Sequence, residues 1–151
     1  MAIAKIVTPT PNPLLGISWD APADLSNRKV QERLSPDAIR TFLKIAEFWE
    51  LGSEDARNLL GGISNGAYYE LRDAEKGKLM DQDKLTRISL LIGIFKALRI
   101  LYSTKLADAW IGLPNTNTIF GGDTPLAYMV RGGMPAILRV RQLLDARRGG
   151  R

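Results

Sequence analysis

The stretch DQDKLTRISLLIGIFKALRILY, residues 81–102, decides the fold of this chain. Its apolar side chains recur three and four residues apart, which predicts an amphipathic helix, and either Asp81 or Asp83 is suited to begin it. We expect this to be the longest helix. Because its apolar stripe is wide, it should be covered on several sides, as a spine that joins both halves of the chain and is available to a dimer interface. The stripe consists of Leu85, Ile88, Leu91, Ile92, Phe95, Leu98, Leu101 and Tyr102.

The same stretch is not predicted to span a membrane. Lys96 and Arg99 interrupt it, and residues 88–102 are fewer than the roughly 20 that a bilayer requires. The N-terminus lacks the uninterrupted apolar core of a signal peptide, because Pro9, Pro11 and Pro13 break it. We therefore expect a cytoplasmic protein without membrane contact.

Three helices are predicted before the spine. Ser35-Pro36-Asp37 indicates the start of the first, because Ser suits the N-cap and Pro suits the first helical position. Ser53-Glu54-Asp55 indicates the start of a second, short helix that stops at Gly61-Gly62, and Ser64 is expected to cap a third. Two short helices joined by a glycine turn have the dimensions of a helix-turn-helix.

Three shorter helices are predicted after the spine, at residues 104–110, 124–131 and 135–147. A loop rich in Gly, Pro and Asn separates the first two, and Gly132-Gly133 separates the last two. No segment shows the alternation of a β-strand, so the predicted fold class is all-α, a small helical bundle. We divide the chain into an irregular arm (1–34), a helix-turn-helix domain (35–102) and a short C-terminal helical domain (103–151).

The composition excludes several kinds of enzyme. The 151 residues contain no Cys and no His, which removes thiolate and imidazole metal ligands, Cys-His dyads and Ser-His-Asp triads. The net charge is +5, and residues 81–151 carry 11 basic and 5 acidic groups, whereas residues 36–80 carry 6 and 8. We expect no catalytic residue, no metal and no cofactor. A binding function remains, with a positive second half that attracts phosphate.

The third predicted helix carries the candidate DNA contacts. Its cap Ser64 and its outward residues Asn65 and Tyr69, flanked by Arg72, are placed to reach a major groove. Asn pairs bidentately with adenine, and Tyr can reach a phosphate or stack. The surrounding segment is net acidic, so other basic groups would have to supply phosphate contacts; candidates are Arg28, Lys29 and Arg33. The alternative is that the short helices form only a core, without DNA contact.

A set of motifs in the C-terminal third resembles a known family. The set is Trp110-Ile111-Gly112-Leu113-Pro114-Asn115, Phe120-Gly121-Gly122-Asp123-Thr124-Pro125-Leu126, Gly132-Gly133 and Arg139-Val140-Arg141. It resembles the toxin-binding domain of the Xre/MbcA/ParS-type antitoxins. That family typically has a Trp near Pro-Asn, a Phe-Gly-Gly segment followed by Ser or Thr, Pro and Leu, and a glycine before the last helix. Upstream, Leu60-Gly61, Ser64 and residues 83–88 resemble the Xre-like helix-turn-helix of the same family.

The resemblance implies an antitoxin paired with a RES-domain toxin, a class related to ADP-ribosyltransferases that degrades NAD or transfers ADP-ribose. Such antitoxins cover the toxin's active-site region with their C-terminal part, and many repress their own operon. The chemistry would then belong to the partner. A homodimer is expected, because helix-turn-helix proteins usually read paired half-sites. The candidate toxin-binding residues are Trp110, Asn115, Phe120, Gly121, Gly122, Thr124, Leu126, Arg147, Arg148 and Arg151.

These predictions have alternatives. Aromatic residues mostly bury, so Trp110 and Phe120 could belong to the core. The terminal arginines form a basic tail that either reaches an acidic or dinucleotide-binding pocket of the toxin or is only solvated. The alternative function is that of a stand-alone helix-turn-helix transcription regulator, whose C-terminal helices serve dimerisation or ligand sensing.

Overall fold

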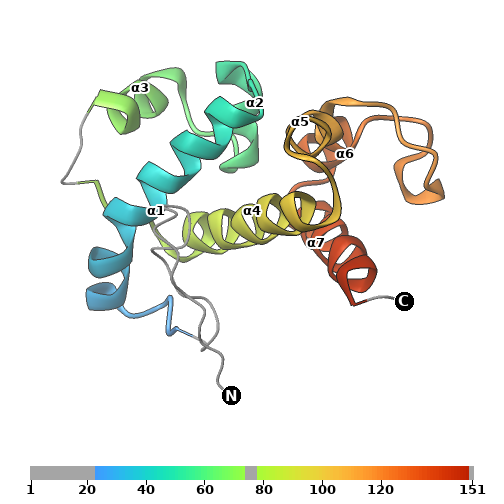
Figure 1. Cartoon of the computed structure of the whole chain (residues 1–151). Coiled ribbons are helices and arrows are strands. Elements are labelled where there is room, and N and C mark those ends of the chain that lie inside the picture. Colours follow the sequence, from blue (N-terminus) through green and yellow to red (C-terminus); the bar gives the residue numbers. More distant parts are fainter. Residues whose placement is uncertain (1–22, 74–77, 150–151) are drawn as a thin grey trace.

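The computed structural model describes residues 23–73 and 78–149, and within these ranges it contains helices and no strand, as predicted. Figure 1 shows α4 running across the molecule, with α1, α2 and α3 at one end and α5, α6 and α7 at the other. The helices are α1 (Arg28–Phe48), α2 (Ser53–Leu59), α3 (Asn65–Asp73), α4 (Gln82–Leu101), α5 (Thr104–Ala109), α6 (Pro125–Gly132) and α7 (Met134–Arg148). Two single turns of 3₁₀-helix, η3 (Trp110–Gly112) and η4 (Thr118–Phe120), lie between α5 and α6.

The predicted start of the first helix at Ser35 is wrong. The helix begins at Arg28, where the Asn27 side chain accepts hydrogen bonds from two backbone N–H groups, and Pro36 lies inside it. The expected arm of residues 1–34 therefore overlaps α1 from Arg28 on, while residues 1–22 lie outside the described residues. As a result α1 has 21 residues and α4 has 20, so the spine is not the longest helix.

Ser35 has another use that explains the error. Its hydroxyl donates to the Gln31 carbonyl one turn back, at 2.6 Å, and accepts from the backbone N–H of Met80, at 2.8 Å. Ser and Pro are typical of helix starts because they satisfy or lack N–H groups there. Here the serine bonds one turn back within α1 and across to the segment before α4, which local sequence does not reveal.

The α4 helix is the spine that its sequence predicts. Asp81 caps it by accepting from the Lys84 N–H at 2.9 Å, and α1, α5 and α7 pack against it. The guanidinium of Arg141 of α7 lies directly over Gly93, in the space that a Cβ at this position would occupy. A longer residue at 93 would therefore displace the end of the Arg141 side chain.

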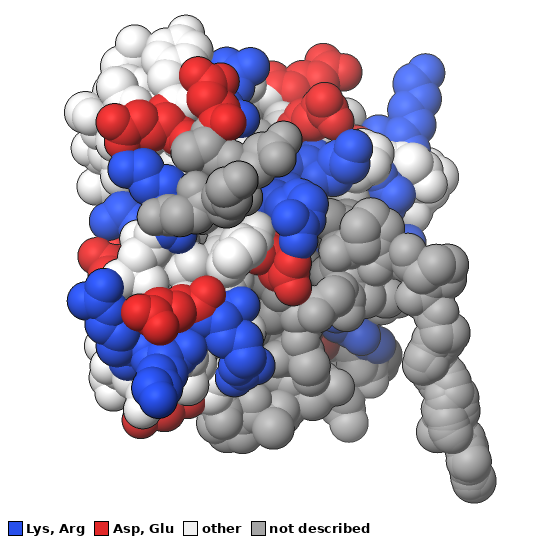
Figure 2. Space-filling view, turned by 90° about the vertical axis from the view of Figure 1, so that its left-hand side faces the viewer, with Lys and Arg blue, Asp and Glu red and all other residues white. Residues whose placement is uncertain are grey.

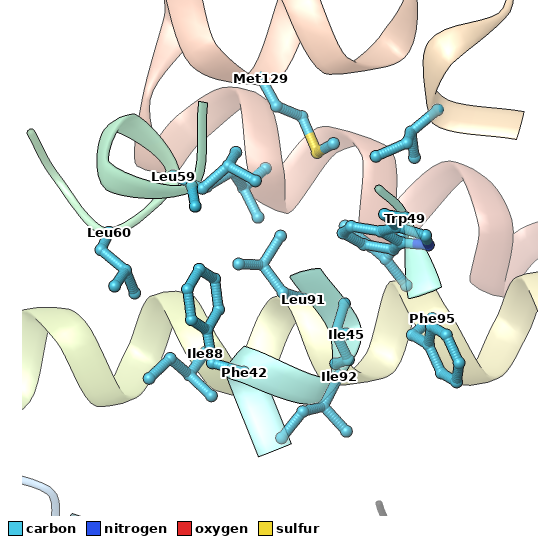
Figure 3. Close-up of a cluster of buried hydrophobic side chains, with 14 of the residues drawn as sticks. Phe42, Ile45, Trp49, Leu59, Leu60, Ile88, Leu91, Ile92, Phe95 and Met129 are labelled. Carbon is cyan, nitrogen blue, oxygen red and sulfur yellow. The ribbon is translucent and has the colours of Figure 1, made fainter. Parts of the chain in front are cut away.

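A single apolar core runs through both halves of the molecule. Figure 3 shows Leu59 of α2, Leu91 of α4 and Met129 of α6 in one cluster, and all three are fully buried. The α2 helix contacts α6 directly. The helix-turn-helix and the C-terminal helices are thus packed on one another as well as on the spine.

The turn between α2 and α3 depends on two glycines. Gly61 and Gly62 have φ of +98° and +85°, a region that L-residues with side chains rarely adopt. Ser64 then caps α3, as predicted, by accepting from the Ala67 N–H at 3.0 Å. The α2–turn–α3 unit therefore consists of two short helices joined by a glycine turn, as the sequence predicts.

In the described part of the chain, no helix is both long enough and apolar enough to cross a bilayer.

Candidate functional site

The C-terminal candidate site is a loop built on three aromatic rings. Phe120 contacts Trp110 edge to face, with ring centroids 6.1 Å apart, and contacts Tyr128 in the same manner at 5.2 Å. Phe120 is 1% exposed and Trp110 is 6% exposed. The structure therefore places both predicted toxin-binding aromatics in the core of this chain, where they hold the loop between α5 and α6 in position.

Polar groups keep this loop in a defined shape. The Asn115 side chain accepts from the Asn117 N–H at 2.8 Å, and the Asn117 side chain accepts from the Ile119 N–H at 3.0 Å. Side chains that bond their own backbone two residues on make tight Asx turns. The loop surrounds an open hollow of about 580 Å³, lined by Pro114, Asn115, Thr116, Asn117, Thr118, Gly121 and Gly122.

Gly121 and Gly122 lie at the exposed tip of this loop. Their φ angles are +58° and +89°, so the chain reverses direction there without a side chain. Thr124 then caps α6 by accepting from the Ala127 N–H at 3.1 Å, and Leu126 is half-buried. Of the predicted residues in this loop, the two glycines and the Asn side chain are therefore available to a partner, while Thr124 holds the start of a helix.

The terminal arginines differ from the predicted tail. Arg147 and Arg148 belong to the last turn of α7, and an Arg147 N–H donates to the Tyr102 hydroxyl at 3.3 Å. Arg148 is exposed. Arg151 lies outside the described residues. Two of the three arginines are thus held on a helix, at a fixed place beside the end of α4.

One ion pair that sequence reasoning missed fixes α5 against the rest of the molecule. The Arg99 guanidinium makes two hydrogen bonds to Asp108, at 2.9 and 2.8 Å, and lies 4.9 Å from the Phe48 ring and 4.7 Å from the Phe95 ring. A fork of this kind is directional and stronger than a single contact. The two residues are nine positions apart across a bend, a spacing that has no periodic signal in the sequence.

The helix-turn-helix presents the side chains that the sequence assigns to its outer face. Tyr68 and Leu71 are each 5% exposed, while Tyr69 is 47% exposed, and Asn65 and Arg72 are exposed as well. The Arg72 guanidinium lies 5.7 Å from the Tyr69 ring, which is within cation–π range. Asn65, Tyr69 and Arg72 are therefore exposed as predicted, while Tyr68 and Leu71 of the same helix are buried.

The electrostatics around α3 are mixed. Figure 2 shows the face on the left of Figure 1, where Lys and Arg are interspersed with Asp and Glu rather than forming one basic surface. Lys78 pairs with Glu70 of α3 at 2.6 Å. Exposed basic residues follow one side of α1 at intervals of four and seven; they are Lys29, Arg33, Arg40 and Lys44. Arg40 and Lys44 pair with acidic neighbours on the same helix, and no ion pair is found for Lys29 and Arg33 within the described residues.

The acidic groups do not gather into a metal site. No cluster of three or more Asp or Glu side chains suited to a metal ion occurs in residues 23–73 and 78–149. Asp81 has its pKa lowered, chiefly because its carboxylate accepts the Lys84 N–H at the start of α4. The lowered pKa of Asp81 is therefore explained by its role as the cap of α4, and not by a metal-binding or catalytic role.

Two comparisons with known proteins found similarity to this chain. Residues 97–150 match the family model of the antitoxin Xre/MbcA/ParS C-terminal toxin-binding domain. An uncharacterized protein, y4oB, from Sinorhizobium fredii (strain NBRC 101917 / NGR234), is 38% identical over 116 residues, which are 76% of this chain and 87% of the relative. No solved structure matches. The residues that match the family model run from the end of α4 to the end of α7 and contain the loop between α5 and α6 with Trp110 and Phe120. The chain therefore belongs to the family of antitoxins that carry the Xre/MbcA/ParS C-terminal toxin-binding domain.

Proposed function

We propose that this protein is the antitoxin of a type II toxin–antitoxin pair and that its partner is a RES-domain toxin, which consumes NAD or transfers ADP-ribose. The antitoxin acts by binding, with its C-terminal part over the toxin's active-site region. Both NAD and operator DNA are cytoplasmic, so we place the pair there.

The loop at residues 113–122 is the observation that supports this proposal most. Its polar backbone is exposed around a hollow, and its shape is fixed by Asx turns and by the buried Phe120. A loop ordered before binding loses little conformational entropy in a complex, which favours affinity. It also lies inside the segment that matches the toxin-binding family.

The test is to co-express the chain with the product of the neighbouring gene, which this proposal requires to be a RES-domain protein. We expect rescue of growth, a complex that survives gel filtration, and cellular NAD kept at the level of toxin-free cells. If the two proteins form no complex and growth is not rescued, the antitoxin proposal is wrong. The chain would then be better described as a stand-alone transcription regulator.

A second role, repression of its own operon, is supported by the outer face of α3. Asn65, Tyr69 and Arg72 are exposed on a helix that Ser64 caps, and Lys29 and Arg33 are exposed basic residues of α1. We propose that a homodimer places two α3 helices in successive major grooves of operator DNA. Mobility shifts on the upstream DNA test this, and sequence-selective, salt-sensitive binding is the supporting result.

A further inference from the structure

We infer that a groove formed by both halves of the molecule receives a segment of the toxin that carries an aliphatic side chain flanked by basic residues. This inference rests on the proposed toxin-binding function and deepens it, because it assigns residues of the N-terminal half to the interface. The groove has a volume of about 620 Å³. One wall is the end of α1 and the start of α2, and the other is α5, η3 and the start of α6.

Exposed apolar side chains from both walls line the groove. Phe48 at the end of α1 is 39% exposed, and Leu113 just after η3 is 44% exposed. Leu126 of α6 also lines the groove and is half-buried. Pockets of this volume with apolar walls are the usual seats of anchoring side chains at interfaces. An aliphatic side chain is therefore the expected central contact.

The groove also holds a hydrogen-bond donor that is not satisfied. Trp49 lines it and is 7% exposed, and its indole Nε1 has no hydrogen-bond partner among the described residues. This nitrogen is itself shielded from solvent, so a bound segment would reach it only if this wall of the groove moved; as the structure stands, the buried donor costs free energy. The next residue in the chain, Glu50, has a backbone φ of +54°, a value that is uncommon for residues other than Gly, Asn and Asp. Unfavourable backbone conformations of this kind concentrate at binding sites.

The charge of the groove selects a basic occupant. Glu50 and Asp55 lie on its lining, and neither forms an ion pair within the described part of the chain. Asp108 is already neutralised by Arg99, which leaves Lys105 as the basic residue of the lining. This is an acidic site in a chain of net charge +5. Free carboxylates beside an apolar wall complement Lys or Arg that flank an aliphatic residue.

The position of the groove identifies the toxin as the source of that segment. The α5–η3–α6 wall belongs to residues 97–150, which match the toxin-binding family. The groove thus continues the surface that carries the exposed loop at residues 113–122. The opposite wall, Phe48 to Asp55, lies outside the matched residues and is the new part of the interface.

Three variants test the groove with the purified chain and the RES-domain toxin identified by the co-expression test, in a catalytically inactive form. Leu113→Glu places a charge among the apolar walls, and Glu50→Gln combined with Asp55→Asn removes the acidic rim. Leu138→Glu is the matched control, because Leu138 is 41% exposed on α7, away from the groove lining. We expect calorimetry to show at least about a tenfold rise in Kd for Leu113→Glu and a weaker salt dependence for the double variant, with the control unchanged. Thermal melting confirms that each variant is folded.

A photo-cross-linking amino acid at position 113, and in a second preparation at position 138, tests the occupant directly. An adduct of this chain with the toxin from position 113 and not from position 138 supports the inference. An adduct of two copies of this chain in the presence of toxin overturns it in favour of a dimer contact. If the wild type binds the toxin and the groove variants bind it with the same Kd, the groove inference is rejected and the antitoxin proposal stands. Absence of wild-type binding rejects the antitoxin proposal, and the inference with it.

Discussion

The hydroxyl of Ser35 accepts a hydrogen bond from the backbone N–H of Met80, at 2.8 Å, and so joins two points that are 45 residues apart in the chain. Ser35 is 1% exposed and lies on α1, while Met80 is 4% exposed and comes just before the cap of α4. The same hydroxyl donates to the Gln31 carbonyl. One serine therefore fixes where the chain enters the spine relative to the first helix.

Ser35→Ala should destabilise the protein by about 1–3 kcal/mol, because it leaves the buried Met80 N–H without an acceptor. Urea unfolding followed by circular dichroism measures the free energy of unfolding. Ser26→Ala is the control, since Ser26 is exposed and, within the described residues, its hydroxyl bonds only to the nearby Asp24. Equal stabilities of the two variants would show that the Ser35 bond contributes nothing beyond a surface contact.

Gly133→Ala should lower the free energy of unfolding by about 1–3 kcal/mol. Gly133 has φ +70° and ψ −151° between α6 and α7, a conformation that is essentially restricted to glycine. Gly112→Ala is a matched control, because Gly112 has open space at its Cβ position and no positive φ. A Gly133→Ala protein as stable as the Gly112→Ala protein would contradict this assignment.

Asp81→Ala should cost about 1 kcal/mol at pH 7, since the Asp81 carboxylate caps α4. Hydrogen bonding lowers the Asp81 pKa in the folded state below its ordinary value of 3.8. Because the pKa of Asp81 is lower in the folded than in the unfolded state, the ionised carboxylate stabilises the fold above pH 3.8. This stabilisation is lost as the pH falls below that value and the carboxylate becomes protonated. The difference between wild type and variant should therefore shrink as the pH of the unfolding experiment falls from 5 to about 3. A constant difference over that range would contradict an ionised cap.

Asn65→Ala and Tyr69→Ala should reduce selectivity for operator DNA over random DNA. Lys29→Ala and Arg33→Ala should instead weaken binding to both and lower the slope of log K against log salt by about 1 per residue. Fluorescence anisotropy at several salt concentrations separates the two effects. If the wild type binds no DNA in a sequence-selective manner, α2 and α3 serve only as scaffold.

Removal of residues 147–151 should weaken inhibition of the toxin, measured as NAD turnover during titration with antitoxin. A single Arg148→Ala change should account for much of the loss, because Arg148 is exposed and Arg147 already bonds Tyr102. Arg139→Ala is a control on an exposed arginine of the same helix. Full inhibition by the truncated protein would exclude a contact between these arginines and the toxin.

Features set by a few adjacent residues could be predicted from the sequence. The caps Ser64, Asp81 and Thr124 are examples, because each side chain bonds an N–H group only three residues on. The inward side of α3 followed from periodicity in the same way. Such features can be predicted because they depend on residues only three or four positions apart in the sequence.

Features that depend on packing could not be predicted. Ser35-Pro36 has the composition of a helix start, yet the pair lies inside α1 because Ser35 bonds across to Met80. The Arg99–Asp108 pair and the groove beside Trp49 need the relative positions of α1, α4 and α5. Burial of Trp110 and Phe120 likewise followed from how the loop folds back on α6, and the sequence left both possibilities open.

The shared core of α2, α4 and α6 limits how this protein can evolve. Leu59, Leu91 and Met129 lie in one buried cluster, so the helices proposed to face DNA and those proposed to face the toxin share a single core. A recombination event that exchanged residues 103–151 for those of a distant relative would leave unmatched apolar surfaces on both sides of the joint. Under the proposed function, we therefore expect a change of toxin partner to come from point changes on the surface rather than from exchange of the C-terminal helices.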